Sequence, residues 1–384
     1  MNINFICFIT NIAVTLLCGL LMLIIPTLTR KSYLFGVKVP IEKQSCSEAK
    51  GLKKRYTTIC MAGFVAILAL VFAQYLFFPD ITLVSVMYFP FLFVAAQMSA
   101  FIPNWKSALK LKKERGWKVS SSVFAETKSS YSRGNLSELP WIWYAGSFII
   151  IFISFILALV KFPSLPNLIP THFDINMQPD AWSDKSFLSV SAMPLINFAT
   201  LILMWAVGLM FVKAKLQIDP QNPALSFTQH RIYRRRIGHS LGFITFGLTA
   251  SMALIGLLSI YPDLNIPFVP LISFTSISII PTIVVPIISG QSGCKIKPKN
   301  FIKNITENSG DSQSNDTVEY NDDKYWALGM FYHNRNDPAY IVEDRFGGNL
   351  GFNYARLPVK IGIAALIPAF IAMYVLITVM IFYI

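Results

Sequence analysis

The residues best suited to binding chemistry gather in one polar loop between two long apolar segments. Trp182 offers an aromatic face, while Asp180 and Lys185 offer opposite charges, and this mixture can bind a peptide or a lipid headgroup. The alternative interpretation is structural, with Trp182 as an interface anchor and Ser183 or Asp184 capping the next helix. The candidate ligand-binding residues are Pro170, His172, Phe173, Asp180, Trp182 and Lys185.

A second candidate set lies near the C-terminus, after the polar stretch Ile302–Asn321, which is typical of a flexible linker. Glycines and an Asp-Pro turn alternate with aromatic residues there, a pattern that predicts short β-ribbons. The segment is either a docking face for a cytosolic regulator or a rigid collar that packs its aromatic side chains under the helices. A third interpretation is a phosphate or metal site from Asp322, Asp323 and Asp337. The candidate residues are Asp323, Tyr325, Trp326, Gly329, Phe331, Tyr332, Asn334, Asp337, Pro338, Arg345 and Asn353.

The sequence contains no complete motif of a known enzyme active site or cofactor site. None of the four histidines belongs to an HExxH motif, and there is no P-loop and no GxGxxG. Residues 290–294 begin like a GxSxG nucleophile turn but end on Cys294. The five cysteines contain no CxxC pair, so we expect no disulfide and no zinc site. We therefore predict a protein that is not an enzyme and needs no metal or cofactor.

The elements that position these loops are membrane helices. Hydrophobic residues make up 54% of the 384 and charged residues only 14%, against about 25% in soluble domains, which excludes a soluble enzyme and a disordered chain. A bilayer core needs roughly 20 apolar residues in a helix. The segments that qualify are Phe5–Leu28, Ile59–Phe78, Ile81–Ile102, Trp141–Val160, Leu188–Val212, Ser240–Tyr261, Pro267–Ile288 and Ile361–Tyr383. We read the first as a retained span, because no Lys or Arg precedes it.

The basic residues predict the orientation of these spans. All but Lys161 and Lys185 of the 33 Lys and Arg residues fall in every second loop. The positive-inside rule makes these loops cytoplasmic, so both termini and the loop with Trp182 lie outside. The net charge of +13 then reflects topology and attraction to anionic membrane lipid, and no nucleic-acid partner is expected.

The interiors of the spans contain no Asp, Glu, Lys, Arg or His. Ion-coupled pathways are usually built from such groups, so their absence disfavours ion-coupled transport. The intramembrane polar residues are Asn11, Gln74, Gln97 and Asn197. They either form hydrogen bonds between helices or contact a substrate.

The polar loop resembles the Pro-x-His-Phe … Gly-x-Pro-Asp-x-Trp … Lys signature of a membrane domain of unknown function. That domain forms the N-terminal part of the Sdp-type toxin-immunity proteins of Gram-positive bacteria. Met177 stands where the family usually has glycine. Strings similar to Tyr33–Pro40 occur in longer proteins with the same domain, although an interfacial turn broken by Gly36 and Pro40 explains this string physically. Residues 322–356 resemble a second small domain of unknown function of the DD-x-YW … FY-x-N … DP type.

Composition, spacing and resemblance together predict an all-α integral membrane protein of the bacterial plasma membrane, with about eight transmembrane helices and a small cytoplasmic module before the last one. The expected divisions are residues 1–139 (three helices with basic cytoplasmic loops), 140–288 (four helices and the external loop), 289–321 (linker), 322–360 (cytoplasmic module) and 361–384 (final helix).

The resemblance implies a non-enzymatic toxin-immunity or envelope-sensing protein. Its expected partners are membrane lipid, an external peptide toxin or envelope component, and a cytosolic regulator. The alternative is a transporter or flippase for an amphipathic or lipid-linked substrate.

Overall fold

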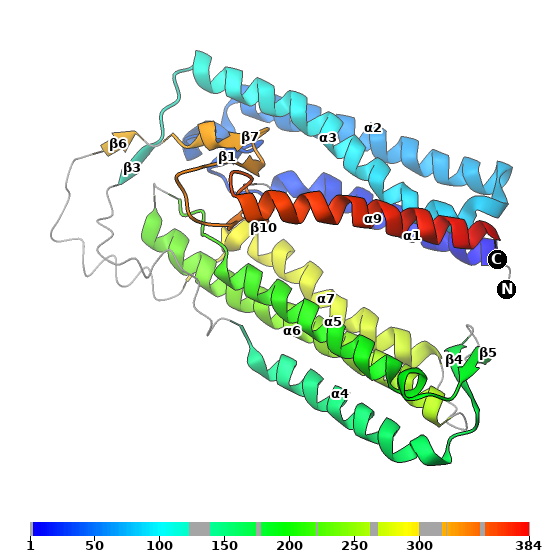
Figure 1. Cartoon of the computed structure of the whole chain (residues 1–384). Helices are drawn as coiled ribbons and strands as arrows, with labels where there is room; N and C mark the ends of the chain where they lie inside the picture. Colours follow the sequence, from blue (N-terminus) through cyan, green and yellow to red (C-terminus); the bar gives the residue numbers. More distant parts are fainter. Residues whose placement is uncertain are drawn as a thin grey trace. The chain divides into compact units, whose positions relative to one another are not determined.

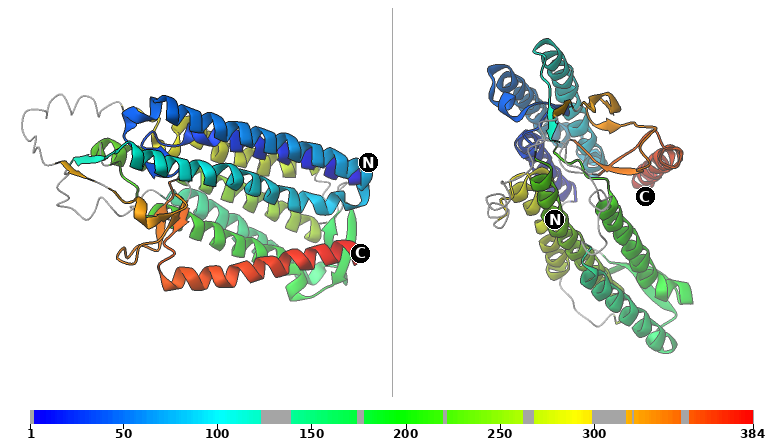
Figure 2. Two further views of the ribbon diagram at one scale, coloured as in Figure 1. Left: turned by 90° about the horizontal axis from the view of Figure 1, so that it is seen from above. Right: turned by 90° about the vertical axis from the view of Figure 1, so that its left-hand side faces the viewer.

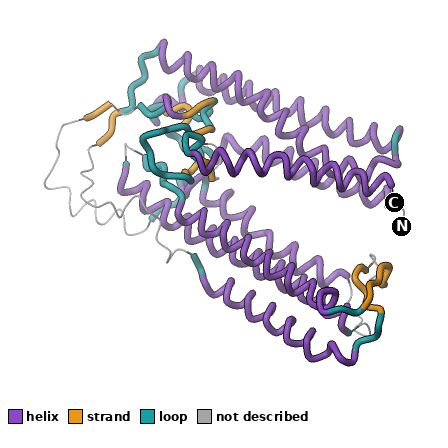
Figure 3. Tube along the Cα trace, viewed as in Figure 1, coloured by secondary structure: helices purple, strands orange, loops and turns teal. Residues whose placement is uncertain are grey.

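The computed structural model describes residues 3–122, 139–173, 178–219, 222–261, 268–298, 317–319, 321–345 and 350–383. Most of these residues are helical, and the strands are short (Figures 1 and 3). The long helices are α1 (Ile3–Leu28), α2 (Ser47–Phe77), α3 (Thr82–Glu114), α4 (Trp141–Lys161), α5 (Phe187–Lys213), α6 (Pro223–Ile260), α7 (Phe268–Ser289) and α9 (Leu357–Tyr383).

Several of these helices are suited to a membrane. By length and composition, those able to cross it are Asn4–Pro26, Ser47–Phe77, Trp141–Ser164, Phe187–Lys213 and Ala224–Ile260. Two shorter apolar helical stretches, Ser273–Ser289 and Leu357–Pro368, lie in α7 and α9. The chain is therefore a helical multi-pass membrane protein. The number of eight spans and the outer position of both termini remain predictions.

The chain divides into two compact units. The first unit consists of Met1–Thr127, Gln217–Ser226 and Asn304–Ile384, and the second of Lys128–Leu216 and Phe227–Lys303. The predicted linker lies largely outside the described residues, since 299–316 are not described.

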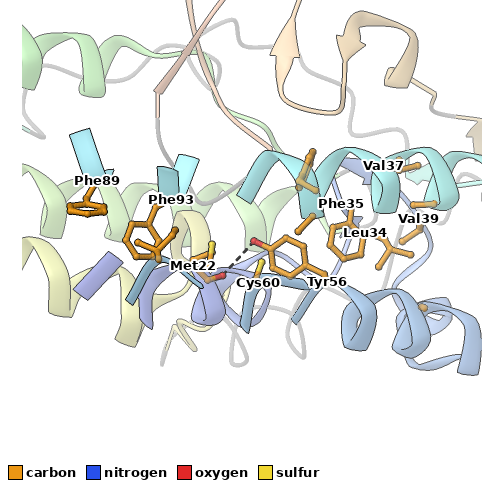
Figure 4. Packing of buried hydrophobic residues seen from close by; sticks show 14 of the residues in the cluster. Met22, Leu34, Phe35, Val37, Val39, Tyr56, Cys60, Phe89 and Phe93 are labelled. Atoms are coloured by element: carbon orange, nitrogen blue, oxygen red, sulfur yellow. Dashed lines mark hydrogen bonds between the residues drawn. The ribbon is translucent and has the colours of Figure 1, made fainter. Parts of the chain in front are cut away.

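In the first unit, α1, α2 and α3 run side by side (Figure 2). Their shared core is aromatic and well filled (Figure 4). Phe8 stacks on Tyr75 with ring centroids 4.1 Å apart, and the hydroxyl of Tyr56 donates to the carbonyl of Met22 over 3.4 Å. The core continues past the helix ends into Leu34, so the segment after α1 is packed as tightly as the helices.

Polar residues within the apolar helices connect neighbouring helices. The Asn11 amide of α1 donates to the Ser85 hydroxyl of α3 over 2.8 Å. In the second unit, the Asn197 amide of α5 donates to the Thr249 carbonyl of α6 over 2.9 Å. These bonds agree with the interhelical interpretation of the two asparagines, since such groups need a partner in an apolar interior.

Short antiparallel strand pairs accompany the helices of the first unit. The pair after α1 is β1 (Tyr33–Leu34) with β2 (Val37–Lys38). Near the C-terminus β7 (Trp326–Ala327) pairs with β8 (Phe331–Tyr332), and β9 (Ile341–Glu343) with β10 (Leu350–Phe352). The fourth pair is β3 (Ser120–Ser122) with β6 (Thr317–Glu319). The β-ribbons predicted within residues 322–356 are thus confirmed.

The second unit contains α4, α5 and α7 with most of α6. Helix α4 packs along α5, and β4 (Leu168–Phe173) with β5 (Pro179–Asp184) forms a hairpin between them (Figure 1). At the other end of α5, the buried Arg234 guanidinium of α6 donates to the Val212 carbonyl over 2.6 Å and to the Ala214 carbonyl over 2.5 Å. Carbonyls at a helix C-terminus lack helical partners, so this arginine stabilises the end of α5.

The topology can be measured with single cysteines in a background without the native ones. Thr171→Cys in β4 and Lys113→Cys near the end of α3 both replace exposed residues. Because of the distribution of basic residues, we expect a membrane-impermeant maleimide added to intact cells to label Thr171→Cys and to reach Lys113→Cys only after permeabilisation. The reverse labelling pattern would contradict the orientation and place the loop with Trp182 inside.

Candidate functional site

The β4–β5 hairpin holds the first candidate set. Its strands pair Leu168 with Asp184, Ile169 with Ser183 and Pro170 with Trp182, and a β-bulge follows Pro170. Residues that face each other across an antiparallel pair lie on the same side, and the side alternates along the strand. The Ile169 side chain is buried in the core of the second unit. On the other face, Leu168, Trp182 and Asp184 are exposed, whereas Pro170, the partner of Trp182, is buried.

The base of the hairpin is fastened by Lys185. Its ammonium donates to the Leu165 carbonyl over 2.9 Å and to the Pro163 carbonyl over 3.2 Å, and its backbone N–H donates to Asn167 over 2.7 Å. It also lies 5.2 Å from the ring centroid of Phe162. These contacts use the charge of Lys185 to hold the chain between α4 and β4.

Helix α5 begins directly after this lysine. Ser186 is its N-cap, and a reciprocal capping box joins Ser186 to Ser189. The interpretation of Ser183 or Asp184 as the cap is wrong, because the strand continues through both residues. Asp184 is thereby left on the hairpin with an exposed side chain.

His172 and Asp180 meet at the far end of the hairpin. The Nδ1 atom of His172 lies 2.5 Å from an Asp180 carboxylate oxygen, and both side chains are exposed. Such a pair can position an imidazole or bind a cation. Within the described residues no group of three His, Cys, Asp or Glu side chains is arranged to hold a metal ion.

The hairpin brings the six predicted residues together in different roles. His172, Asp180 and Trp182 are exposed, Phe173 and Lys185 are half-buried, and Pro170 is buried. The sequence did not predict Asp184 as a ligand-binding residue, because an aspartate just before a helix is typical of an N-cap. Its period-two spacing from Trp182 along β5 is the signal that could have identified it.

Most residues of the second candidate set lie in a cluster of the first unit that we call the junction, which consists of β1, β2 and residues 322–345. Its centre is Arg345, whose side chain is fully buried. The guanidinium carbon lies 4.6 Å from the ring centroid of Trp326 and 5.1 Å from that of Tyr33. An arginine between two aromatic faces makes cation–π contacts with both.

Two carboxylates neutralise Arg345. Its Nη1 donates to Asp323 over 2.6 Å and to the Gly36 carbonyl over 3.0 Å, and its Nη2 pairs with Asp322. Lys112 of α3 binds the other oxygen of Asp323 over 2.6 Å. The two aspartates thus bind cationic side chains of this chain, which argues against their role in a metal or phosphate site.

The junction is closed by two glycine turns in contact. Gly36 lies between β1 and β2 with φ of 76°, and Gly329 lies between β7 and β8 with φ of 72°. A Cβ atom on Gly36 would stand 2.2 Å from the Gly329 carbonyl oxygen. The string Tyr33–Pro40 and the C-terminal module are therefore one packed structure, which the interpretation of the string as an independent interfacial turn did not anticipate.

A second buried ion pair joins the junction to Arg30, which follows α1. Arg30 Nη2 pairs with Glu343 over 2.9 Å. The same carboxylate oxygen accepts the Gln217 N–H over 3.0 Å, and Arg30 donates to the Gln217 carbonyl. The loop between α5 and α6 is thus held by residues from both ends of the chain. Neither Arg30 nor Glu343 stands out in the sequence, since each lies in a charged stretch.

Hydrogen bonds fix the rest of the module. The buried Asn353 donates to the carbonyls of Asn334 (2.9 Å) and Asp337 (3.1 Å), and Tyr332 donates to the Asp337 carboxylate over 2.7 Å. Of the candidate residues, Trp326, Gly329, Tyr332, Asp337, Arg345 and Asn353 are buried, Asp323, Tyr325 and Asn334 are half-buried, and Phe331 and Pro338 are exposed.

Burial perturbs the titration of the junction. It lowers the pKa of the Lys38 ammonium to about 8, and the charge of Asp322 limits this fall. Burial also raises the pKa of Tyr33 to about 12. For Asp322, burial acts to raise the pKa, but Arg345 and Lys38 outweigh it and hold the pKa below its ordinary value. Asp322 is thus held as an anion beside the arginine.

Comparison with known proteins gives a match that covers part of the second unit. Residues 149–198 match the model of DUF1648, a domain of unknown function. The match extends from α4 through the whole β4–β5 hairpin into α5, so it contains all six candidate residues of the loop. No curated protein and no solved structure matches the chain.

Replacing Gly36 by alanine tests the contact between the two turns. The left-handed conformation alone costs about 1–2 kcal/mol for a residue with a Cβ, and the clash with the Gly329 carbonyl adds to it. We expect a clear fall in the melting temperature of the purified protein. Gly51→Ala is the control, because this exposed helix position has nothing within 4 Å. Equal melting temperatures for both variants would contradict the contact.

The lowered pKa of Lys38 predicts a pH dependence. The folded chain holds this proton less tightly than the unfolded chain, so between pH 8 and 10.5 the unfolded chain binds more protons, and raising the pH stabilises the fold. We expect the melting temperature of Lys38→Met to rise less than that of the wild type between pH 7.5 and 9.5, at roughly constant ionic strength. Parallel curves would contradict the lowered pKa of Lys38.

Proposed function

We propose that this chain is a non-enzymatic protein of the bacterial plasma membrane that serves in toxin immunity or envelope sensing. The β4–β5 hairpin binds an extracellular ligand, and the C-terminal module docks a cytosolic regulator. One observation carries the proposal: the hairpin is fastened to its unit by Ile169 and Lys185, while it leaves Trp182 and the His172–Asp180 pair exposed.

The exposure of Trp182 supports a binding surface. Its side chain is 53% exposed although it belongs to a paired strand. A rigid aromatic side chain on a fixed hairpin contributes contact area to a ligand at low entropic cost. The resemblance of this loop to the Sdp-type immunity proteins supports the same function.

Residues of the C-terminal module support both interpretations of its sequence, the rigid collar and the docking face. Trp326, Tyr332 and Arg345 are buried, as a collar requires. Phe331 and Tyr340 are 40% and 54% exposed and are available for docking. We propose that residues 322–356 correspond to the small domain of the second resemblance and that in this chain they pack as part of the first unit.

Receptor function accounts for the polar residues of the helices better than transport does. The amides of Asn11 and Asn197 donate hydrogen bonds to neighbouring helices. These groups therefore stabilise helix packing, which a receptor needs, and they do not have to contact a transported substrate.

Survival measurements test the proposal. A host that lacks the native gene is complemented with the wild type, Trp182→Ala or Trp141→Ala and challenged with membrane-active peptides and cell-wall inhibitors. We expect the wild type to raise survival under at least one challenge and Trp182→Ala to abolish this gain, because the ligand loses its aromatic contact.

Trp141→Ala is the matched control, since Trp141 is an exposed tryptophan at the start of α4. Membrane blotting must show equal amounts of all three proteins. Full protection by Trp182→Ala, or no gain from the wild type under any challenge, would overturn the proposal.

A further inference from the structure

We propose that the ligand of the β4–β5 hairpin is a cationic amphipathic peptide. This inference rests on the proposed function and specifies the chemistry of its ligand. It follows from the two carboxylates that stay exposed on the hairpin, while the ammonium of Lys185 contacts backbone carbonyls.

The first step concerns the positive charge of the loop. In the sequence, Lys185 offers a cation beside Asp180, so the loop can pair with either sign. The structure points the ammonium of Lys185 at the carbonyls of Leu165 and Pro163 instead. Lys161, the other basic residue predicted to lie outside, places its ammonium 5.2 Å from the ring centroid of Tyr261. Both lysines thus serve the local packing of the second unit.

The second step concerns the carboxylates. Asp180 and Asp184 precede and follow Trp182 by two residues along β5, and all three side chains are exposed. Asp180 contacts His172, whereas Asp184 forms no ion pair with any described residue. The exposed strip of the hairpin is therefore an indole between two carboxylates. Carboxylates attract Lys and Arg side chains, and an indole face binds the same cations through its quadrupole.

The third step concerns the apolar surface beside this strip. Leu168, which pairs with Asp184, is 55% exposed. Trp182, which lies two residues before Asp184 on the same strand, is 53% exposed. Carboxylates next to apolar side chains complement a partner that combines cationic and apolar residues. A purely polar cation would leave the apolar part of the surface uncovered.

The fourth step distinguishes a peptide from a small amine. Asp180 and Asp184 are four residues apart on a strand, which separates them by roughly 13 Å. One amine cannot contact both carboxylates, but two cationic residues of one chain can. The strip therefore fits a polypeptide with repeated positive charge.

The test uses the full chain in nanodiscs of phosphatidylcholine, whose zwitterionic surface limits attraction of the probes to lipid. The first probe is a fluorescent peptide of alternating Lys and Leu. A second probe carries Glu in place of Lys, and a third carries Ser in place of Leu. We expect the first to bind more tightly than the other two, and its affinity to fall as salt is raised.

The variant Asp180→Asn/Asp184→Asn should weaken binding of the first probe by about tenfold or more, because charge-assisted contacts are lost while the shape is kept. Glu114→Gln is the control, since it removes one exposed carboxylate from the end of α3. Equal affinity of the double variant and the wild type, or preference for the Glu peptide, would overturn the inference.

The outcomes separate this inference from the proposed function. If Trp182→Ala abolishes protection in cells while no probe binds the purified protein, the cationic peptide is wrong and the external ligand loop stands. If the probes bind as expected but Trp182→Ala still protects, the hairpin binds cationic peptides and the immunity or sensing function is wrong.

Discussion

The first unit depends on the burial of one guanidinium. Moving a charge out of water is costly unless charges and hydrogen bonds replace the solvent, and removing one partner of a buried pair is strongly destabilising. Arg345 meets this constraint with two carboxylates, two aromatic faces and a backbone carbonyl. Each partner must be in place when the arginine is buried, so the groups that surround it are fixed together.

This constraint joins segments that are far apart in the chain. Tyr33 and Gly36 follow α1, Lys112 ends α3, and the aspartates and Trp326 precede α9. The Gly36–Gly329 contact adds a steric condition, because neither turn leaves room for a side chain. A nearby pair, Arg30 and Glu343, holds the backbone of Gln217 in the same way. The C-terminal module is consequently part of the fold of the first three helices.

In the hairpin of the second unit a charged side chain is also held by protein groups, but here the groups are backbone carbonyls and not carboxylates. Its lysine satisfies backbone carbonyls, as the Arg234 guanidinium does at the end of α5. The ammonium of Lys185 keeps its charge, but it lies against these carbonyls and forms no ion pair with Asp180 or Asp184 among the described contacts. A structural requirement at the base of the hairpin therefore determines the charge of its exposed surface, and this links the local fold to the class of ligand that we propose.

From the sequence alone the long apolar helices could be predicted, because runs of about 20 apolar residues are typical of helices that cross a bilayer. The types and spacing of residues also singled out the hairpin loop and the aromatic module. Ion-pair partners could not be predicted from the sequence. Arg30, Lys38 and Lys112 are three among many basic residues near helix ends, and only the tertiary structure decided which of them are buried. It also decided that Lys185 supports the backbone while Asp184 stays exposed, since a side chain's role depends on which atoms the fold brings within hydrogen-bonding distance.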